Sequence, residues 1–415
     1  MAFNFNFPIV LGGPNSAGGI TVGKIPSDVA TTSTTTTTTT TTAAPLAAGL
    51  YAFGDATPSN GIYQDITSPA STVTQIDSSA TWTSFDQSSG YNATNTLVIR
   101  KNDTELWGWG YNSYGQLAQN NTIHRSSPVQ IAGAWSKVAV TAGIKSDGTL
   151  WMWGPSYGGV LGNNVGYSND WKSSPIQTVA GGNTWTNMVT AGGATIAVKS
   201  DFSMWSWGLN YSGRLGHYNQ TNRSSPVQIT YPTSFQWGTK IAMTGTYGAA
   251  INKFNLLYMW GDNTYGQLGS SDTMSRSRPN QVGVTDQYSH VAIGDNCTYA
   301  VKTDGTLWTW GKNTNGYRLG IEENWYTPNN SNIVDPAQVN GGGTYIKAAI
   351  NADYARVFLK SDGTLWGLGY LKHLGIGEPA NSTAKVSSPI QIGGGNSGWV
   401  DIIAYNDKFF AIKSS

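Results

Sequence analysis

Short stretches of alternating apolar and polar residues recur from about residue 46 to the end of the chain, separated by turns or Gly-rich loops. An aromatic-x-aromatic-Gly signal, or a close relative of it, marks seven of these stretches. The seven signals are Tyr51–Gly54, Trp107–Gly110, Trp151–Gly154, Trp205–Gly208, Tyr258–Gly261, Trp308–Gly311 and Trp366–Gly369, and their starts lie 44 to 58 residues apart. Alternation is typical of half-buried strands, and a period of this length indicates a repeat protein made of small antiparallel sheets.

Further signals keep a constant place in each repeat. Upstream of the aromatic strand lies an Asp-Gly turn, as in Lys145–Gly148, and Asp-Gly supplies the positive φ that a tight hairpin needs. Downstream come an Asn-x-x-Gly-Gln-Leu-like loop, as in Asn112–Leu117, and a Pro-x-Gln-apolar segment, as in Pro128–Ile131. Seven such units predict an all-β fold, a seven-bladed β-propeller.

The two ends of this repeat region complement each other. The C-terminal segment Phe410–Ser415 matches the first half of a repeat hairpin, and Gly49–Gly54 matches the second half. We therefore predict that the N- and C-terminal strands pair to close the ring and remove an exposed sheet edge. The side chains expected at this closure are Leu50, Tyr51, Phe53, Phe410 and Ile412.

These motifs resemble the regulator of chromosome condensation repeat family, whose consensus joins a Leu-Trp-x-Trp-Gly strand to Asn-x-x-Gly-Gln-Leu-Gly and a later Pro. The resemblance covers roughly residues 46–415 and implies a seven-bladed propeller. The family includes a guanine-nucleotide exchange factor and bacterial inhibitor proteins, so the fold does not assign a function. Eukaryotic members often carry a His before the Asp-Gly hairpin, where this chain has pairs such as Cys297-Thr298. No residue for nucleotide exchange can be transferred.

Two segments precede the repeats. Residues 1–30 form an arm that is too short to fold alone and begins with apolar side chains, whereas residues 31–45 are a Thr-rich, low-complexity linker. An extended arm with an apolar head is expected to anchor the protein to a partner. The anchoring side chains predicted here are Phe3, Phe5, Phe7, Ile9, Val10 and Leu11.

Charge argues against several partner classes. The chain has 24 Lys and Arg against 23 Asp and Glu, which gives a net charge of +1, so we expect no nucleic-acid binding.

An apolar run long enough to cross a membrane is missing from the sequence, and so is a basic, apolar secretion signal near residue 1, so we expect no membrane insertion and no standard export. The single cysteine, Cys297, excludes an internal disulfide.

Candidate chemistry is sparse. The segment Gly18–Lys24 approaches a phosphate-loop spacing, but Ile25 replaces the required Ser or Thr, so a flexible arm explains it better. The histidines fall in different repeats, at positions 124, 217, 290 and 373, and the aspartates 147, 304 and 362 occupy equivalent turns. We predict no catalytic, cofactor or metal-binding residues, and hence no enzyme.

The repeated aromatic residues are expected to fill the space between blades, because Trp107 and Trp109 alternate along one strand. Aromatic residues outside the repeat phase are better candidates for exposed binding to a glycan or a protein receptor. They are Tyr167, Trp171, Tyr218, Trp325 and Tyr326.

Two functional hypotheses follow. In the first, the protein is a virion component, such as a phage fibre, spike or capsid decoration protein, that is assembled in the host cytoplasm. It would bind other virion proteins through residues 1–30 and present the propeller to a host surface glycan, a protein receptor or neighbouring virion proteins. In the second, it is a cytoplasmic regulatory or inhibitory propeller that binds a partner protein.

Overall fold

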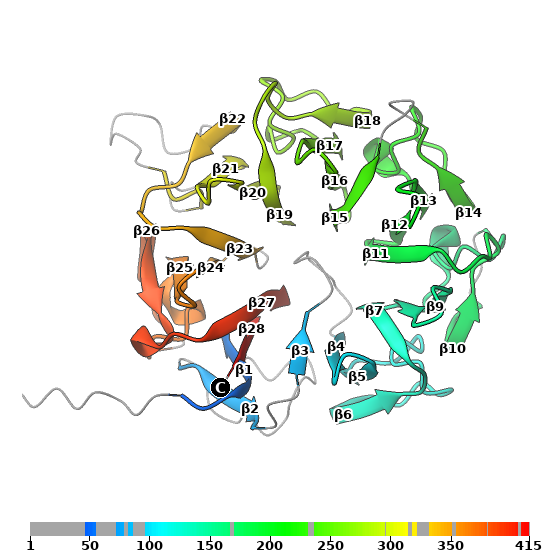
Figure 1. Cartoon of the computed structure of the whole chain (residues 1–415), viewed down its shortest axis with the longest axis horizontal. Coiled ribbons are helices and arrows are strands. Elements are labelled where there is room, and N and C mark those ends of the chain that lie inside the picture. The colour runs from blue at the N-terminus through cyan, green and yellow to red at the C-terminus, as the bar shows by residue number, and fades with distance from the viewer. Residues whose placement is uncertain are drawn as a thin grey trace, which may run out of the picture. The chain divides into compact units, whose positions relative to one another are not determined.

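The computed structural model describes residues 46–54, 72–78, 82–85, 96–166, 170–230, 236–294, 296–313, 318–321, 332–350, 354–379, 381–405 and 408–414. These residues form seven four-stranded antiparallel sheets around a central axis (Figure 1). The predicted all-β, seven-bladed propeller is therefore confirmed. The arm at residues 1–30, with its anchoring side chains, and the linker at 31–45 lie outside the described residues.

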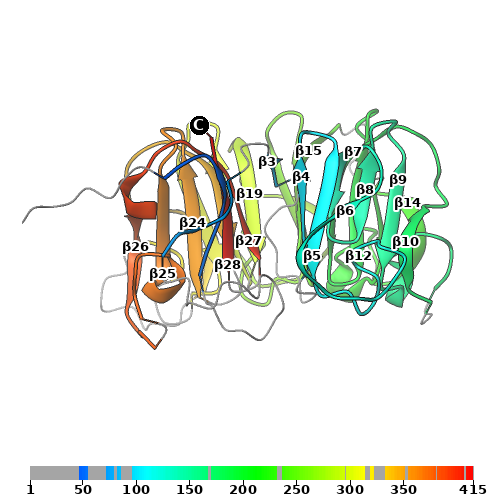
Figure 2. The same ribbon diagram turned by 90° about the horizontal axis from the view of Figure 1, so that it is seen from below.

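The four strands of each sheet run roughly along the axis and are ordered outward from it (Figures 1 and 2). The innermost strands are β3 (Trp82–Ser84), β7 (Trp135–Ala139), β11 (Trp185–Ala191), β15 (Trp237–Met243), β19 (Tyr288–Gly294), β23 (Tyr345–Ile350) and β27 (Trp399–Tyr405). The second strands are β4 (Thr96–Lys101), β8 (Ala142–Lys145), β12 (Ala194–Lys199), β16 (Tyr247–Asn252), β20 (Cys297–Lys302), β24 (Ala355–Lys360) and β28 (Lys408–Lys413).

The aromatic signals form the third strands. These are β5 (Glu105–Gly110), β9 (Leu150–Gly154), β13 (Met204–Gly208), β17 (Leu257–Gly261), β21 (Leu307–Gly311), β25 (Leu365–Tyr370) and β1 (Gly49–Gly54). The outermost strands are β6 (Arg125–Ile131), β10 (Lys172–Gln177), β14 (Arg223–Gln228), β18 (Arg276–Gln281), β22 (Ile333–Gln338), β26 (Lys385–Ile392) and β2 (Thr74–Asp77). All but β2 contain a proline, which a sheet edge tolerates because its N–H side needs no partner.

The ring closes through the two ends of the repeat region. Strand β1 lies between β2 and the C-terminal strand β28 and pairs with β28 from Gly49↔Lys413 to Gly54↔Lys408. The five side chains predicted at the closure are at most 3% exposed. Phe53 stacks on Phe409, with ring centroids 5.5 Å apart. The predicted closure is confirmed.

The second tryptophan of the aromatic signal connects adjacent blades. The indole N–H of Trp153 donates to the carbonyl of Gln116 at 2.8 Å, and that of Trp310 donates to the carbonyl of Gln267 at 2.9 Å. Each acceptor belongs to a loop of the preceding blade, and both indoles are fully buried. The expectation that the repeated aromatic residues fill the space between blades is confirmed for these second tryptophans, which also add a directional bond there, whereas the first one of a signal, such as Trp107, is only partly buried.

All the third strands run in the same direction from one face of the propeller to the other, so each face carries one kind of connection. The Asp-Gly turns precede these strands on one face, which we call the turn face. The Asn-x-x-Gly loops follow them on the opposite face, which we call the loop face. Figure 2 shows the ring edge-on, with the C-terminus at the upper, turn-face side. Among the described residues, no helix has the length and apolar character needed to span a bilayer.

Candidate functional site

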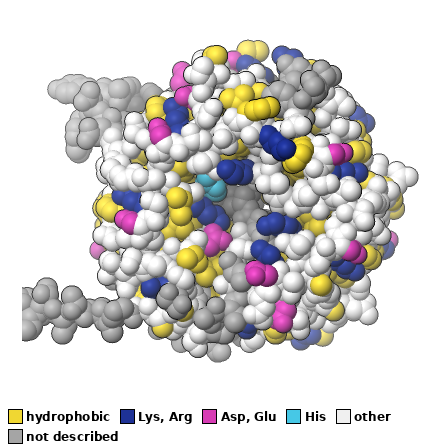
Figure 3. Space-filling view, viewed as in Figure 1, with side chains coloured by type: hydrophobic (Ala, Val, Ile, Leu, Met, Phe, Trp, Pro, Cys, Tyr) yellow, Lys and Arg dark blue, Asp and Glu magenta, His cyan; other side chains and the backbone are white. Residues whose placement is uncertain are grey.

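The repeated aspartates stand in the Asp-Gly turns and thus on the turn face, which is the face that Figure 3 shows. The carboxylate of Asp147 accepts hydrogen bonds from the backbone N–H and the hydroxyl of Thr149, at 2.9 and 2.6 Å. Asp304 and Asp362 make the same pair of bonds with the threonine two residues later. These hydrogen bonds hold the pKa of each carboxyl group below its ordinary value. Each carboxylate is therefore engaged in its own turn, and the three lie in different sheets.

The lysine that opens each turn is also engaged locally. The Nζ atoms of Lys302 and Lys360 lie 3.6 Å from the ring centroids of Trp308 and Trp366. The indole N–H of Trp308 in turn donates to the hydroxyl of Thr306 at 2.8 Å. Cation–π contacts of this kind stabilise a hairpin. The Asp, Thr, Lys and Trp side chains of these repeats thus support the turn and form no paired acid and base.

The loop face is organised by buried asparagines. The Oδ1 atom of Asn112 accepts a hydrogen bond from the backbone N–H of Leu117 at 2.8 Å, and its Nδ2 donates to the carbonyl of Asn121 at 3.0 Å. Asn210 and Asn263 make the corresponding contact to the residue five positions later, at 2.9 Å. All three asparagines are fully buried. A single amide therefore fastens both ends of each loop and restricts its motion.

A buried arginine adds a connection between two blades on this face. The guanidinium of Arg214 donates to the carbonyls of Leu209 at 2.8 Å, Gly192 at 2.9 Å and Gly245. Burial lowers the pKa of Arg214 to about 10, so its guanidinium remains charged at neutral pH. Three charge-assisted bonds to backbone carbonyls make this part of the loop face rigid.

Exposed aromatic side chains gather on the loop face of three consecutive blades. They project from the segments that follow β5, β9 and β13. We call them the aromatic patch: Tyr114 (45% exposed), Tyr157 (38%), Trp171 (45%), Tyr211 (59%) and Tyr218 (52%). The rings of Tyr114 and Trp171 meet edge to face, with centroids 5.9 Å apart and an interplanar angle of 73°.

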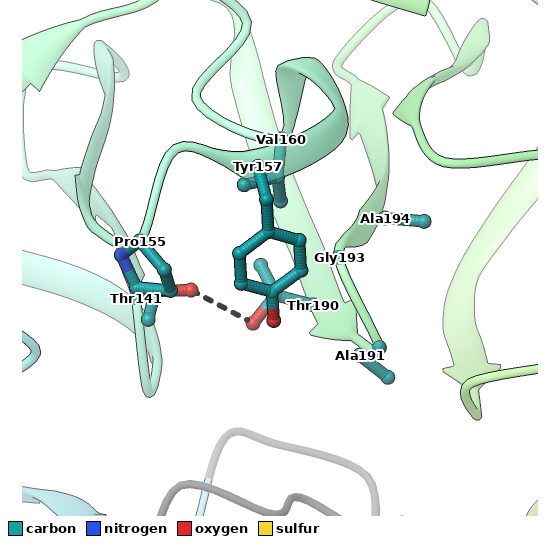
Figure 4. Close-up of a pocket in the computed structure, with 9 residues that line it drawn as sticks. Thr141, Pro155, Tyr157, Val160, Thr190, Ala191, Gly193 and Ala194 are labelled. Atoms are coloured by element: carbon teal, nitrogen blue, oxygen red, sulfur yellow. Dashed lines mark hydrogen bonds between the residues drawn. The ribbon is translucent and has the colours of Figure 1, made fainter. Parts of the chain in front are cut away.

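A small pocket lies beside Tyr157 (Figure 4). Its floor includes Thr141 and Thr190, whose hydroxyl oxygens are 3.4 Å apart, and Pro155 lines one side. The pocket has a volume of about 30 Å³. Small-molecule sites usually measure about 300–1,000 Å³. This pocket therefore has room for a water molecule or the tip of a side chain, but not for a metabolite.

A larger groove of about 570 Å³ lies between the outer parts of two neighbouring sheets, next to β18 and β22. Its charged side chains are already engaged. Lys302 pairs with Asp286 at 2.9 Å, and Asp335 accepts a hydrogen bond from the hydroxyl of Ser271 at 2.6 Å. The groove therefore offers no constellation of free catalytic groups.

The histidines lie in four different sheets or their loops. His124 stacks on Tyr111, with centroids 4.7 Å apart, and His373 stacks on Tyr354 at the same separation. His217 contacts the hydroxyl of Ser206 at 2.9 Å. Within the described ranges, no group of three His, Cys, Asp or Glu side chains is placed to hold a metal ion.

Two of the five exposed binding candidates from the sequence, Trp171 and Tyr218, have exposed side chains, and both lie on the loop face. Tyr167, Trp325 and Tyr326 lie outside the described residues. The sequence interpretation missed Tyr114, Tyr157 and Tyr211, although a signal existed. All three stand in the Gly-rich loop directly after an aromatic strand, on the same face as Trp171.

Parts of the chain match a family model described as the regulator of chromosome condensation (RCC1) repeat. The matched segments are residues 103–144, 203–251 and 255–301, and a second model of the same description matches residues 288–316. All of these segments lie in the propeller. The comparison thus supports the repeat type that the sequence motifs indicate.

Several curated proteins are similar to parts of this chain. The mitochondrial RCC1 domain-containing protein RUG3 of Arabidopsis thaliana is 26% identical over 231 residues, which are 52% of each chain. The ultraviolet-B receptor UVR8 of Arabidopsis thaliana is 26% identical over 304 residues, covering 69% of this chain and 66% of the receptor. The human E3 ubiquitin-protein ligase HERC2 is 28% identical over 229 residues, covering 52% of this chain and 5% of the ligase. The chain therefore matches only part of the length of these relatives.

Solved structures share the architecture. Prp20p from Saccharomyces cerevisiae superimposes with a TM-score of 0.72 at 15% identity, over 89% of this chain and 92% of that one. Human WBSCR16 gives a TM-score of 0.68 at 14% identity, over 89% and 100%. At such identities the likeness establishes the fold alone. None of the proteins named here is described as a virion protein, so the comparisons give no support to the virion hypothesis.

Proposed function

We propose, from the premise that this chain is a seven-bladed propeller of RCC1 repeats, that it is a non-catalytic module that binds a protein partner on its loop face. The observation that carries the proposal is the aromatic patch. Its five Tyr and Trp side chains come from three consecutive blades and are 38–59% exposed. Tyr and Trp are the residues most enriched at the centres of protein interfaces, where a few of them supply most of the binding free energy.

The loops beneath the patch favour tight association. Asn112 and Asn210 fix the loops that carry Tyr114, Tyr211 and Tyr218 through buried hydrogen bonds. A binding surface that is already ordered loses little conformational entropy when a partner arrives. The small pocket beside Tyr157 would accept the tip of one partner side chain.

The charged side chains of the turn face and the described pockets favour a binding role over a catalytic one. The repeated aspartates and lysines of the turn face serve their own hairpins, and the described pockets are too small or already occupied by paired groups. A protein partner on a propeller also fits the relatives, because Prp20p was characterised with its binding to Gsp1p and histones, and a complex with Kap60 is known for the same yeast protein.

The proposal corresponds to the second hypothesis from the sequence. The virion hypothesis depends on residues 1–30 and the Thr-rich linker, which lie outside the described residues. Aromatic rings also stack on sugars, so a glycan is the alternative ligand that the experiment must separate from a protein.

The test is site-specific photo-cross-linking in cells that naturally produce the protein. A benzophenone amino acid replaces Tyr114 or Trp171 in the full chain, and a matched control carries it at Phe254, which is 65% exposed on the turn face. Illumination followed by mass spectrometry should identify the same protein from both loop-face positions and not from the control. Cross-links confined to Phe254, or adducts with glycans only, would overturn the proposal.

A further inference from the structure

Several tyrosines of the loop face lie under a cation that this same chain supplies. The distances from the cationic atom to the ring centroid are 5.4 Å for Arg214 over Tyr211, 5.5 Å for Arg278 over Tyr218 and 5.2 Å for Lys312 over Tyr265. A cation within about 6 Å of a ring centroid is attracted by the negative face of the ring. Aromatic rings on this face are therefore placed in a way that suits the binding of cations.

Tyr114 and Tyr265 occupy the same place in two nearly identical Asn-x-Tyr-Gly-Gln-Leu loops. In the blade that follows Tyr265, Lys312 comes directly after the glycine that ends β21, and its ammonium group lies over the Tyr265 ring. In the blade that follows Tyr114, Pro155 comes directly after the glycine that ends β9. A proline side chain carries no charge, so this blade does not supply Tyr114 with the cation that Tyr265 receives.

Trp171 enlarges the exposed aromatic surface at Tyr114. The two side chains are each 45% exposed, with ring centroids 5.9 Å apart and an interplanar angle of 73°, and we call them the open ring pair. Tyr111 adds a third ring, whose centroid lies 6.3 Å from that of Tyr114 at an interplanar angle of 60°. Rings inclined to each other form a corner in which one cation can contact more than one ring, as in the aromatic cages that bind ammonium groups.

The charges on either side of Trp171 balance each other. Lys172 forms an ion pair with Asp170, with Nζ 2.6 Å from the carboxylate oxygen. The Asp170 side chain is 65% exposed, so its negative charge lies near the surface that a partner would approach. An incoming cation therefore meets no unbalanced positive charge from residues 170–172.

We propose that the open ring pair binds a basic side chain of the protein partner, either the ammonium group of a lysine or the guanidinium group of an arginine. This inference rests on the proposed function and gives the partner a chemistry, because its contact with Tyr114 and Trp171 is then a cation and not an apolar anchor. The partner's cation takes the place at Tyr114 that Lys312 occupies at Tyr265.

The test is a ligand-observed NMR titration of the full chain with two pairs of short peptides. One pair carries arginine or citrulline, which are similar in shape and differ in charge, and the other carries lysine or acetyl-lysine. At least one charged peptide should bind about fivefold more tightly than its neutral counterpart, because a cation–π contact at an exposed site contributes about that factor. A preference in one pair only identifies the side chain. Equal affinities within both pairs, or no saturable binding of either charged peptide, would overturn the proposal.

Variants locate this preference on the molecule. Tyr114→Leu should abolish it, whereas Tyr265→Leu, the matched control in the equivalent loop, should leave it unchanged because Lys312 already lies over that ring. Pro155→Lys should also abolish the preference, because the introduced ammonium group supplies the cation from within the chain, and Pro155→Gln should retain it. Equal loss in Tyr114→Leu and Tyr265→Leu, or an unchanged preference in both Tyr114→Leu and Pro155→Lys, would overturn the assignment to the open ring pair.

The inference and the proposed function fail in different ways. If cross-linking from Tyr114 and Trp171 identifies a partner while charged and neutral peptides bind equally, the loop face is the binding face and only the basic contact is wrong. If cross-linking identifies no protein from either position, the proposed function itself is wrong.

Discussion

Removal of strand β1 is expected to open the ring and destabilise the whole propeller. A chain that begins at residue 56 lacks β1, whereas a chain that begins at residue 46 retains it. Strand β1 buries Leu50, Tyr51 and Phe53 to 1% exposure or less and pairs with β28 and β2 on its two sides. Burial of one large apolar side chain contributes about 1.5–3 kcal/mol, so these three contribute about 5–9 kcal/mol together. Whole domains are stable by about 5–15 kcal/mol.

The assay is thermal unfolding followed by circular dichroism, combined with size-exclusion chromatography. The longer chain should melt cooperatively as a monomer-sized species or a defined oligomer. The shorter chain should lose most of its stability or aggregate, because β28 becomes an unpaired, hydrophobic sheet edge. If both chains melt within about 2 °C of each other and elute alike, β1 does not close the ring in solution, and the reasoning from burial is wrong.

Three further perturbations test the connections inside the propeller. Trp310→Phe keeps an aromatic ring but removes the N–H that donates to the carbonyl of Gln267. Urea unfolding should therefore show an unfolding free energy lower by about 1–2 kcal/mol. An unchanged urea midpoint would contradict the role of this hydrogen bond. Asn263→Ala leaves the N–H of Leu268 without its acceptor in a buried loop and should lower the unfolding free energy by about 2–3 kcal/mol. Asn263→Asp should not rescue it, because the buried carboxylate would face the carbonyl and carboxylate of Asp272, to which the Asn263 amide now donates. Asp304 has a lowered pKa in the folded state, so its stabilising effect is present at neutral pH and is lost as the pH falls below about 4. Asp304→Asn should therefore flatten the profile of unfolding free energy against pH between about pH 5 and 2. A profile identical to that of the unchanged protein would refute this.

The architecture was predictable because its signals are local and repeated. The Trp-x-Trp-Gly strands and the Asp-Gly turns each follow from residue types with strong conformational preferences. Closure was predictable because one hairpin is divided between the two ends of the repeat region, near Tyr51 and Phe410. These features depend on the order of residues along the chain and on no detail of packing.

The binding surface was only partly predictable. Tyr114 and Tyr265 occupy the same position in nearly identical loops, yet Tyr114 is 45% exposed and Tyr265 is half-buried. The difference arises from neighbouring loops, because Lys312 lies over Tyr265 whereas Trp171 meets Tyr114 edge to face. Loop neighbours in adjacent blades are not encoded by the repeat itself.

The register of the innermost strands was hidden from the sequence for a different reason. A strict two-residue alternation places Lys240 by counting from Trp237, but the register shift between these two residues moves it to a new position in the ladder. Bulges are fixed by the pairing of two strands, and a single strand sequence does not reveal them. The equivalence of Lys240 with His290 and Asp401 therefore emerges only from the paired sheets.

The most direct test of the central claim is the dissociation constant of the cross-linked partner, measured by biolayer interferometry on the full chain. The double variant Trp171→Ala, Tyr211→Ala is compared with Phe254→Ala, which removes an exposed aromatic side chain from the turn face. If the loop face is the binding face, the double variant should bind at least about 30-fold more weakly, as expected for the loss of one interfacial hot spot of 2 kcal/mol, and the control should bind normally. Equal affinities for the double variant and the unchanged protein, or a loss confined to Phe254→Ala, would contradict the assignment of the loop face.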